Sequence, residues 1–286
     1  MDAEHRSRFF RGPLAARAAR WLITITLVLG AFIATFPLYY TVVTALKTNK
    51  AYALSRFAFP ADPTLVNFAI QFRRFNVARL IFNSAVTTTG GVVLCTLLAI
   101  MVAYAVTKIR FPGRNTVFAF LVGTLVVPFP TIMIPVYQTA LDLGIVNQYY
   151  GLVLAYTAFG LPLGVYLLGA YFRGIPQEIM EAARMDGASH LQIMARVMVP
   201  ISRPGIAALA IINSVWMWND LLLPLLILPG EKRTTLMVAV ASQRNNIEVN
   251  IPIISAGLTI AIVPILVAYL IFQQQLIKGL TAGAIK

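Results

Sequence analysis

The sequence is poor in the residues on which disulfides, metal sites and catalytic centres depend. Its 286 residues include one cysteine, Cys95, and two histidines, His5 and His190. A single cysteine excludes an intrachain disulfide, and two histidines disfavour a histidine-based metal site. We expect Cys95, which lies in an apolar run, to be a small inert core residue. The chain also lacks a phosphate-cradling glycine loop and a nucleophile elbow, so we expect neither catalysis nor ATP hydrolysis from it.

Charged residues are also scarce. They make up 12% of the chain, whereas hydrophobic residues make up 59%, and the mean hydropathy is +0.78. A soluble domain of this length seldom carries so few charges. Residues 21–46 contain no charged side chain, and a helix of that length exceeds the hydrocarbon core of a bilayer, which is about 30 Å thick. The composition therefore predicts an integral membrane protein.

Apolar runs long enough to cross a bilayer recur along the chain. They predict an all-α polytopic membrane protein with six transmembrane helices, at residues 21–46, 80–107, 115–141, 149–172, 204–228 and 252–277. This interpretation divides the chain into five parts: a basic N-terminal tail (residues 1–20), a first helix (21–46), an extracytoplasmic loop (47–79), a core of five helices (80–277) and a C-terminal tail (278–286). Prolines inside several runs predict kinked helices.

Lysine and arginine are distributed unevenly between the connecting segments. With the N-terminus in the cytosol, 14 of the 23 lie on the inner side and nine on the outer side. The positive-inside rule therefore favours a chain with both termini in the cytosol. Five arginines precede residue 21, and the apolar run after them is too long for a signal peptide, so we expect an uncleaved first span.

The net charge of +13 raises the question of nucleic-acid binding. A nucleic-acid interface would gather its positive charges on one soluble face with aromatic residues between them. Here the charges lie mostly in tails and in connectors between apolar runs. We therefore expect the charges to orient the chain in a lipid bilayer, and we expect no nucleic acid as a partner.

Polar residues inside the predicted spans are few, which makes them candidates for contact with a polar solute. Asp220 is the clearest carboxylate in a span, and Trp218 and Asn219 beside it can stack on and hydrogen-bond a solute. The alternative is an interfacial aromatic belt with a structural hydrogen bond. The candidate pathway residues are Asn83, Asn213, Trp218, Asn219 and Asp220.

One face of the second predicted span carries small side chains. They recur at steps of three and four, at Ser84, Thr88, Gly91, Cys95, Ala99 and Ala103. In lipid, a face of small residues lets two helix backbones approach closely. Close helix packing is therefore one interpretation of this face. The other is that it lines a pathway, with Asn83 and Thr87 on the adjacent row.

A charged segment, EAARMDGASHLQIMARVMVP, occupies residues 181–200 between two apolar runs. Pro176, just before it, suits the first turn of a helix, and Glu178 and Glu181 favour the N-terminal end of that helix. Gly187 is a natural helix stop. The first part of the segment therefore predicts a short helix that ends at the glycine.

The second part of the segment predicts another short helix. Ser189 and Gln192 have the spacing of a capping box, and we expect Pro200 to close the helix. An apolar stripe is expected at Leu191, Met194, Val197 and Met198. A plain connector needs no pair of capped helices. We therefore interpret residues 175–200 as a helix–turn–helix that lies against the inner face of the membrane and docks another protein.

The same segment resembles a known family motif. Glu-Ala-Ala at residues 181–183, Gly187, and Val-Met-Val-Pro at residues 197–200 resemble the EAA motif of binding-protein-dependent ABC importer permeases, in which the last part reads Ile-x-Leu-Pro. Asp186 and Ala188 complete the Asp-Gly-Ala form of carbohydrate-importer permeases. Other stretches are similar to a maltose-transporter permease subunit, in the family's order: FPLYYTVVTALK, FPGRN, IPVYQTALDLGIVNQYYGLVLAY, MWNDLLLPLLIL and GLTAGAIK.

The resemblance implies a fold, a location and partners. The fold is that of a type I ABC importer permease in a bacterial cytoplasmic (inner) membrane. The implied partners are a second permease subunit, two ATPase subunits in the cytosol and an extracytoplasmic solute-binding protein. A heterodimer of permeases is expected, and a homodimer stays open. The chain itself would bind no cofactor, because ATP and magnesium would be held by the ATPase subunits.

The resemblance also assigns roles to residues. Coupling to the ATPases would rest on Glu181, Ala182, Ala183, Asp186, Gly187, Ala188 and Pro200. The C-terminal LTAGAIK would reach toward the same subunits. The binding protein would meet the outer loop, residues 229–251, at Glu231, Lys232, Arg233 and Arg244. An ordinary solvated loop is the alternative there.

The solute is the least specified part of this reading. A sugar or oligosaccharide is expected, because the pathway candidates are aromatic and amide-rich and suit sugar hydroxyl groups. Glycerol phosphate or its diesters are the alternative for the same machinery. A self-sufficient secondary carrier would need paired ionisable groups inside the spans, and a membrane enzyme would need a catalytic cluster. The sequence shows neither feature.

Overall fold

The computed structural model describes residues 13–243 and 250–282, and within these ranges all regular structure is helical. Sixteen helical segments follow one another along the described chain. In the first half they are α1 (Pro13–Ala45), α2 (Asn49–Leu54), α3 (Val66–Arg74), α4 (Val77–Lys108), α5 (Arg114–Gly123), η1 (Thr124–Val126) and α6 (Phe129–Asp142). In the second half they are α7 (Tyr149–Arg173), α8 (Gln177–Met185), α9 (His190–Ile193), η2 (Met194–Met198), α10 (Val199–Ile201), α11 (Arg203–Asn219), α12 (Leu222–Ile227), α13 (Leu236–Ser242) and α14 (Ile251–Ala282).

Four of the described helices are long and apolar enough to cross a membrane. These stretches are Ala19–Ala45, Val77–Lys108, Tyr149–Arg173 and Ile251–Ala268. Two pairs of helices, each bent at a short break, pass the same test together, which brings the number to six when each bent pair is one span. The prediction of an all-α polytopic membrane protein is therefore confirmed, and two of the bends are steeper than the kinks that the sequence pattern predicts.

The first bend interrupts the predicted span at residues 115–141. Arg114–Val126 and Phe129–Asp142 meet at 109°. Val127 has an extended backbone with ψ 115°, as expected for a residue that precedes a proline. Pro128 and Pro130 also lack the N–H groups that a continuing helix would use. The expectation of one kinked helix here is corrected to two helices at a steep angle.

The second difference shortens the predicted span at residues 204–228. α11 ends at Asn219, and Asp220 has an extended backbone with ψ 136°. The Asp220 carboxylate accepts hydrogen bonds from the N–H groups of Leu222 and Leu223, at 3.2 and 3.3 Å, and so caps the short helix α12. The bent pair that includes α11 reaches the other way, to His190–Ile201, at an angle of 80°.

The described chain forms two compact units, one from residues 13–71 and 250–259 and the other from residues 72–243 and 260–282. In the first unit the C-terminal end of α1 is held by the segment that follows it. Asn67 on α3 donates from its side-chain amide to the carbonyls of Ala45 and Lys47, at 2.8 and 2.7 Å. The bond to Ala45 satisfies a carbonyl that the end of a helix leaves free, and the bond to Lys47 holds the segment that follows it.

Lys47 is a buried lysine in the same unit. Its side chain is 1% exposed, and its ammonium group donates to the carbonyls of Ser55 and Arg56, at 2.9 and 3.0 Å. Both carbonyls lie just after α2. The lysine therefore closes a loop around the end of α1, so the first half of the predicted extracytoplasmic loop is a folded structure.

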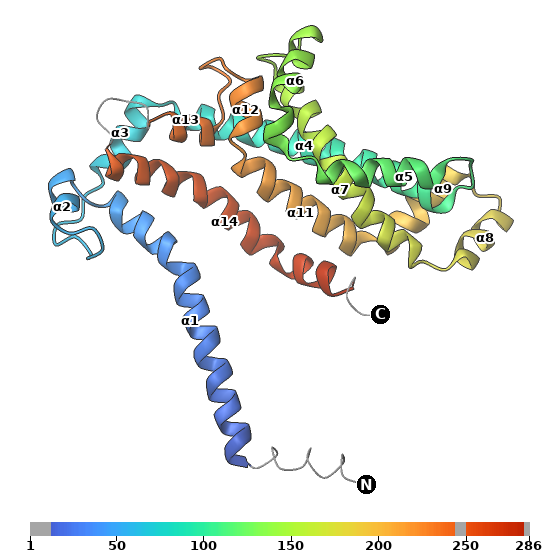
Figure 1. The fold of residues 1–286 in the computed structure, drawn as a ribbon, viewed down its shortest axis with the longest axis horizontal. Coiled ribbons are helices and arrows are strands. Elements are labelled where there is room, and N and C mark those ends of the chain that lie inside the picture. Colours follow the sequence, from blue (N-terminus) through green and yellow to red (C-terminus); the bar gives the residue numbers. More distant parts are fainter. Residues whose placement is uncertain (1–12, 244–249, 283–286) are drawn as a thin grey trace. The chain divides into compact units, whose positions relative to one another are not determined.

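In the second unit α4, α7 and α11 run side by side (Figure 1). The small-residue face of α4 is buried against α7 and α11. A Cβ atom added to Gly164 on α7 would lie 2.6 Å from the Cβ of Ala99, and one added to Gly160 would lie 2.8 Å from the Sγ of Cys95. Close helix packing is therefore the interpretation of this face that the structure supports.

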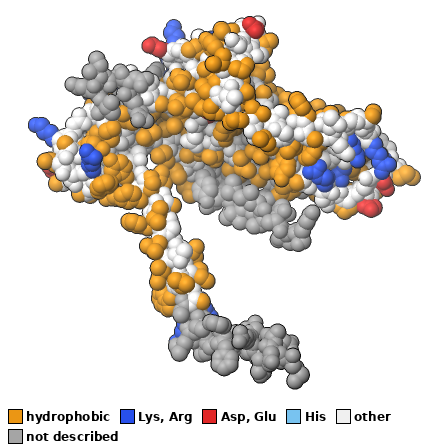
Figure 2. Space-filling model, viewed as in Figure 1, with side chains coloured by type: hydrophobic (Ala, Val, Ile, Leu, Met, Phe, Trp, Pro, Cys, Tyr) orange, Lys and Arg blue, Asp and Glu red, His pale blue; other side chains and the backbone are white. Residues whose placement is uncertain are grey.

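The surface of the chain is apolar over long stretches. Figure 2 shows hydrophobic side chains along α1 and over much of the visible part of the second unit. On α1 the large exposed side chains include Trp21, Leu22, Leu27, Phe32 and Ile33. Exposed apolar surface of this extent suits contact with lipid or with other membrane helices rather than water.

Candidate functional site

The candidate coupling site is the helix pair α8 and α9, which lies at the end of the second unit where α7 finishes (Figure 1). α8 ends in a left-handed turn at Gly187, whose φ is +81°. The N–H of Gly187 donates to the carbonyl of Arg184 at 2.9 Å, and the N–H of Ala188 donates to the carbonyl of Ala183 at 3.0 Å. These two bonds form a Schellman motif. The prediction that Gly187 stops the helix is confirmed, and Pro176 lies one residue before α8 as its N-cap.

α9 begins as the sequence predicts. The Ser189 hydroxyl accepts from the N–H of Gln192, and the Gln192 side chain accepts from the N–H of Ser189, so the capping box is complete. The expectation that Pro200 closes this helix is wrong, because the helix continues to Ile201 and bends at Ser202. Pro200 cannot donate to the carbonyl of Arg196, and the chain widens into the π-helical segment η2 immediately before the proline.

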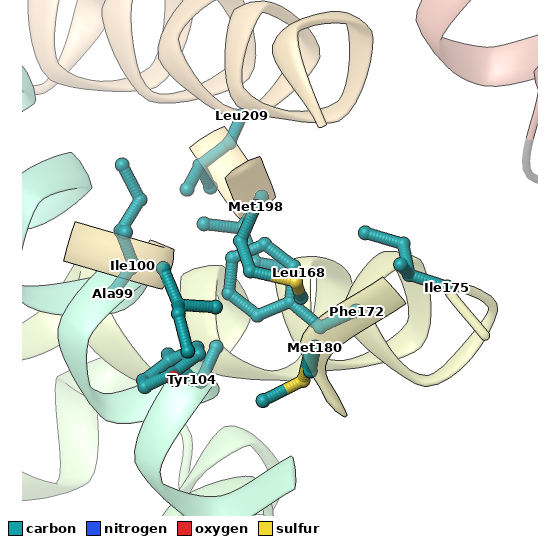
Figure 3. Close-up of a cluster of buried hydrophobic side chains, with 11 residues drawn as sticks. Ala99, Ile100, Tyr104, Leu168, Phe172, Ile175, Met180, Met198 and Leu209 are labelled. Carbon is teal, nitrogen blue, oxygen red and sulfur yellow. The ribbon is translucent and has the colours of Figure 1, made fainter. Parts of the chain in front are cut away.

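A hydrophobic cluster holds this helix pair on the membrane helices (Figure 3). Met180 of α8, Ile193 of α9 and Met198 of η2 are almost fully buried in it. The membrane helices contribute Ala99, Ile100, Ala103, Tyr104, Leu168, Phe172 and Leu209, and Ile175 joins from the connector. The cluster therefore connects α8 and α9 to α4, α7 and α11 at once.

The sequence assigned the buried face of α9 only in part. Leu191 was expected in the apolar stripe, but it is 67% exposed, and Ile193 takes the buried position instead. Met180 was also missed. The helical spacing of Met180 with Ala183, and of Ile193 with Val197, carries the signal, since each pair lies one turn apart and contributes to the cluster.

The outward face of the helix pair combines a carboxylate with apolar side chains. Glu181 and Ala182 are exposed, Met185 is 89% exposed, and Leu191 is exposed as well. Asp186 and Gly187 are exposed at the turn, whereas Ala183 and Ala188 are half-buried against the cluster. Exposed apolar side chains around a charged group outside the long apolar helices are typical of a protein-binding surface.

Among the pathway candidates, Asn83 is fully engaged inside the chain. Its side chain is buried, and its amide nitrogen donates to the carbonyls of Lys232 and Thr234, at 3.1 and 2.8 Å. Its amide oxygen accepts from the hydroxyl of Tyr149 at 2.7 Å. Asn83 thereby joins α4 to α7 and to the segment before α13. Contact with a solute stays a prediction for this residue.

Replacing Asn83 by leucine is expected to destabilise this corner of the protein. The exchange keeps the size of the side chain but leaves two carbonyls and one hydroxyl without their partner, at a cost of about 2–4 kcal/mol. We expect the unfolding midpoint in mild detergent to fall by several degrees. Tyr149→Phe is the matched control, since it removes one of the three bonds and should lower the midpoint less. An equal midpoint for Asn83→Leu and the parent would show that the three hydrogen bonds of Asn83 do not stabilise this corner.

The other pathway candidates also make contacts within the chain. The amide nitrogen of Asn213 lies 3.4 Å from the Sγ of Cys95, and the indole of Trp218 donates to the carbonyl of Ala261 at 3.1 Å. Asn219 is exposed and bonds the carbonyl of Val215. Asp220 caps α12. Trp218, Asn219 and Asp220 are adjacent at the C-terminal end of α11, whereas Asn213 is buried in the interior of the helix. A solute contact stays a prediction for all four.

The predicted outer loop is partly folded. α13 lies within it and packs on α4 through buried Leu236, Val238, Ala239 and Val240. The Arg233 guanidinium donates to the carbonyl of Asn147 and lies over the ring of Tyr149, whereas Glu231 and Lys232 are exposed. Arg244 lies outside the described residues. The exposed pair is therefore better placed than Arg233 to meet another protein.

The described residues hold no group of three or more histidine, cysteine, aspartate or glutamate side chains that could bind a metal ion. The polar side chains described above instead cap helices and form hydrogen bonds between helices. These contacts hold the helices in place.

Comparison with known proteins indicates the same family as the motif at residues 181–200. The family model of the binding-protein-dependent transport system inner membrane component matches residues 63–281. The arabinooligosaccharides transport system permease protein AraQ of Halalkalibacterium halodurans is 33% identical over 93% of this chain and 96% of its own length. The trehalose transport system permease protein SugB of Mycobacterium tuberculosis is also 33% identical, over 95% of this chain and 99% of its own.

Solved structures show the same fold. A bacterial ABC transporter involved in the import of the acidic polysaccharide alginate contains a chain that superposes with a TM-score of 0.75. The match covers 90% of this chain and 96% of that chain, at 23% identity. At that identity the likeness establishes the fold alone.

Proposed function

Because the chain belongs to the family of binding-protein-dependent transport system inner membrane components, we propose that it forms, with a second permease subunit, the membrane pathway of an ABC importer for a sugar or oligosaccharide. The chain is a multi-pass permease of the cytoplasmic membrane. The observation that carries the coupling role is the capped helix pair α8–α9, which shares one buried cluster with the ends of α4, α7 and α11.

The orientation follows from the distribution of positive charge. With both termini in the cytosol, α8 and α9 face the ATPase subunits, and the segment with Glu231 and Lys232 faces outward. ATP and magnesium bind to the two ATPase subunits, and a solute-binding protein delivers the solute from outside. Closure of the ATPases pushes α8 and α9, and the shared cluster carries the movement into three membrane helices as a rigid body.

A sugar is the proposed solute for two reasons. Relatives that match nearly the whole chain are named for arabinooligosaccharides, trehalose, and melibiose, raffinose and stachyose. The adjacent Trp218, Asn219 and Asp220 offer an aromatic face, an amide and a carboxylate, which is the chemistry that binds sugar hydroxyl groups. A heterodimer is proposed, with the second permease supplying further contacts to the solute.

Purification of the tagged chain from native membranes in mild detergent tests the proposal. We expect a second polytopic permease and an ATP-binding-cassette subunit to co-purify, and both to be missing from a mock purification without the tag. The purified complex should hydrolyse ATP faster when a sugar-loaded binding protein is added. A chain that purifies alone and moves solute in vesicles without ATP would overturn the proposal and favour a secondary carrier.

A further inference from the structure

A chain of three polar side chains connects α4 to both helices of the coupling pair. The Tyr104 hydroxyl on α4 lies 3.0 Å from the Nδ1 atom of His190, the first residue of α9. The Nε2 atom of the same imidazole lies 3.2 Å from a guanidinium nitrogen of Arg184 on α8. The Tyr104 and His190 rings also meet edge to face, with centroids 6.1 Å apart. His190 thus adds a polar bridge between α8 and α9 to the turn at Gly187 and the hydrophobic cluster that already join them.

The chemistry of the three groups fixes where the protons lie. A guanidinium group only donates hydrogen bonds, so Nε2 of His190 must accept from Arg184. In a neutral imidazole the other nitrogen then carries the proton, so Nδ1–H donates to the oxygen of Tyr104. The link therefore needs a side chain at position 190 with one acceptor and one donor on opposite sides. Leucine offers neither group, whereas glutamine offers both.

The link runs from the coupling surface, where Arg184 and His190 are exposed, to the buried end of the chain at Tyr104. Tyr104 is 3% exposed and belongs to the hydrophobic cluster, near Met180 (Figure 3). A second polar contact at this end of α4, from the Lys108 ammonium to the carbonyl of Ile175 at 2.7 Å, holds the connector before α8. Only the link through His190 ties α4 to the turn between α8 and α9 among the polar contacts of the described residues.

We propose that His190 is a positioning residue for energy coupling, which fixes the α8–α9 turn to α4 so that a push on the coupling helices moves α4 with them. This inference rests on the proposed function, because it assumes ATPases that act on α8 and α9. The apolar cluster joins the helices through contacts that have no preferred direction. Hydrogen bonds have defined directions, so the link through His190 adds a constraint on the register of the turn with α4.

The test measures how many ATP molecules are hydrolysed for each solute imported. The complete transporter, with its ATPases, partner permease and binding protein, is reconstituted into proteoliposomes with the parent chain or with a variant. His190→Leu and Tyr104→Phe are expected to raise this ratio about fivefold, in the usual range for a lost coupling interaction. The double variant should match His190→Leu alone, because both changes break one link.

Two variants separate the link from general damage. His190→Gln keeps a donor and an acceptor and should hold the ratio within about twofold of the parent. Thr107→Val removes a hydroxyl one turn along α4 that bonds only the carbonyl of Ala103 in its own helix, and it should leave the ratio as it is in the parent. A lower protein yield alone reduces the rate of ATP hydrolysis and the rate of solute import by the same factor. It therefore leaves the number of ATP molecules per imported solute unchanged.

The outcomes also distinguish this inference from the proposed function. One outcome is that the parent complex imports solute with ATP while His190→Leu hydrolyses as many ATP molecules per imported solute as the parent. In that case the positioning role of His190 is wrong, and the proposed importer function is unaffected. The same conclusion follows if His190→Gln fails as badly as His190→Leu. If the parent complex shows no ATP-dependent import at all, the proposed function itself is wrong.

Discussion

Replacing Gly187 by proline is expected to abolish ATP-dependent uptake while the chain still reaches the membrane. The φ of Gly187 is +81°, and a proline ring locks φ near −65°. The exchange also removes the N–H that bonds the carbonyl of Arg184. The conflict costs about 3 kcal/mol or more at the turn, which opens the angle between α8 and α9. The apolar membrane helices lie outside the turn and should still insert.

The measurement for Gly187 combines uptake of labelled sugar with co-purification of the ATPase subunits. Gly113, before α5, is a matched control, because its φ is +82° and nothing lies within 4 Å of an added Cβ atom, as at Gly187. Gly113→Pro creates the same kind of backbone conflict outside the coupling pair, and we expect it to retain the ATPases. Retention of the ATPases and of full uptake by Gly187→Pro would count against the docking role.

Charge reversal at Glu181 tests the same surface without strain in the backbone. The described structure gives this exposed side chain one hydrogen bond, from Gln177 at 3.3 Å, so Glu181→Lys should leave the fold intact. The loss of ATPase association in Glu181→Lys, with Glu181→Gln less affected, would assign the effect to the charge. Equal association in both variants and the parent would remove Glu181 from the docking contact.

The second large effect is expected at Gly164, where α7 crosses α4. An added Cβ atom would lie 2.6 Å from the Cβ of Ala99 and 3.2 Å from a methyl carbon of Leu209. Contacts this short require the helices to separate. We expect Gly164→Ala to cost about 1–3 kcal/mol and Gly164→Leu to cost more, so that the leucine variant fails to accumulate in the membrane.

A size exchange across the same contact separates packing from other causes. Ala99→Gly combined with Gly164→Ala moves the methyl group from α4 to α7, and the pair should recover part of the stability that Gly164→Ala loses. Gly123→Ala is the control, since nothing lies within 4 Å of a Cβ atom there. Folded protein in the membrane is quantified by fluorescence-detected gel filtration. Normal accumulation of Gly164→Leu would contradict the close approach of the two helices.

The sequence predicted those features that depend on local chemistry. The stop at Gly187 and the capping box of Ser189 with Gln192 are properties of a few adjacent residues, and both are confirmed. The long apolar helices follow from composition, since only a helix satisfies its own backbone groups in lipid. The small-residue face of α4 was recognised, and the structure decided between its two interpretations in favour of packing.

The features that the sequence did not predict depend on partners distant in the chain. Burial of Ile193 instead of Leu191 is set by which face of α9 meets α4 and α7, and the link from Tyr104 to His190 joins residues 86 positions apart. The bend near Pro128 was expected as a kink, and its size of 109° depends on how α6 packs. Asp220 was assigned to the interior of a span, but it caps α12 because α11 ends at Asn219.

The most direct test of the account is the ATP dependence of sugar accumulation by the complete transporter in proteoliposomes. Mg-ATP is enclosed in the lumen, and the binding protein with labelled sugar is added outside. For an ABC importer, we expect sugar to accumulate only with hydrolysable ATP inside and only when the ATPase subunits are present. Accumulation at the same rate by this chain alone, without ATP, would contradict it.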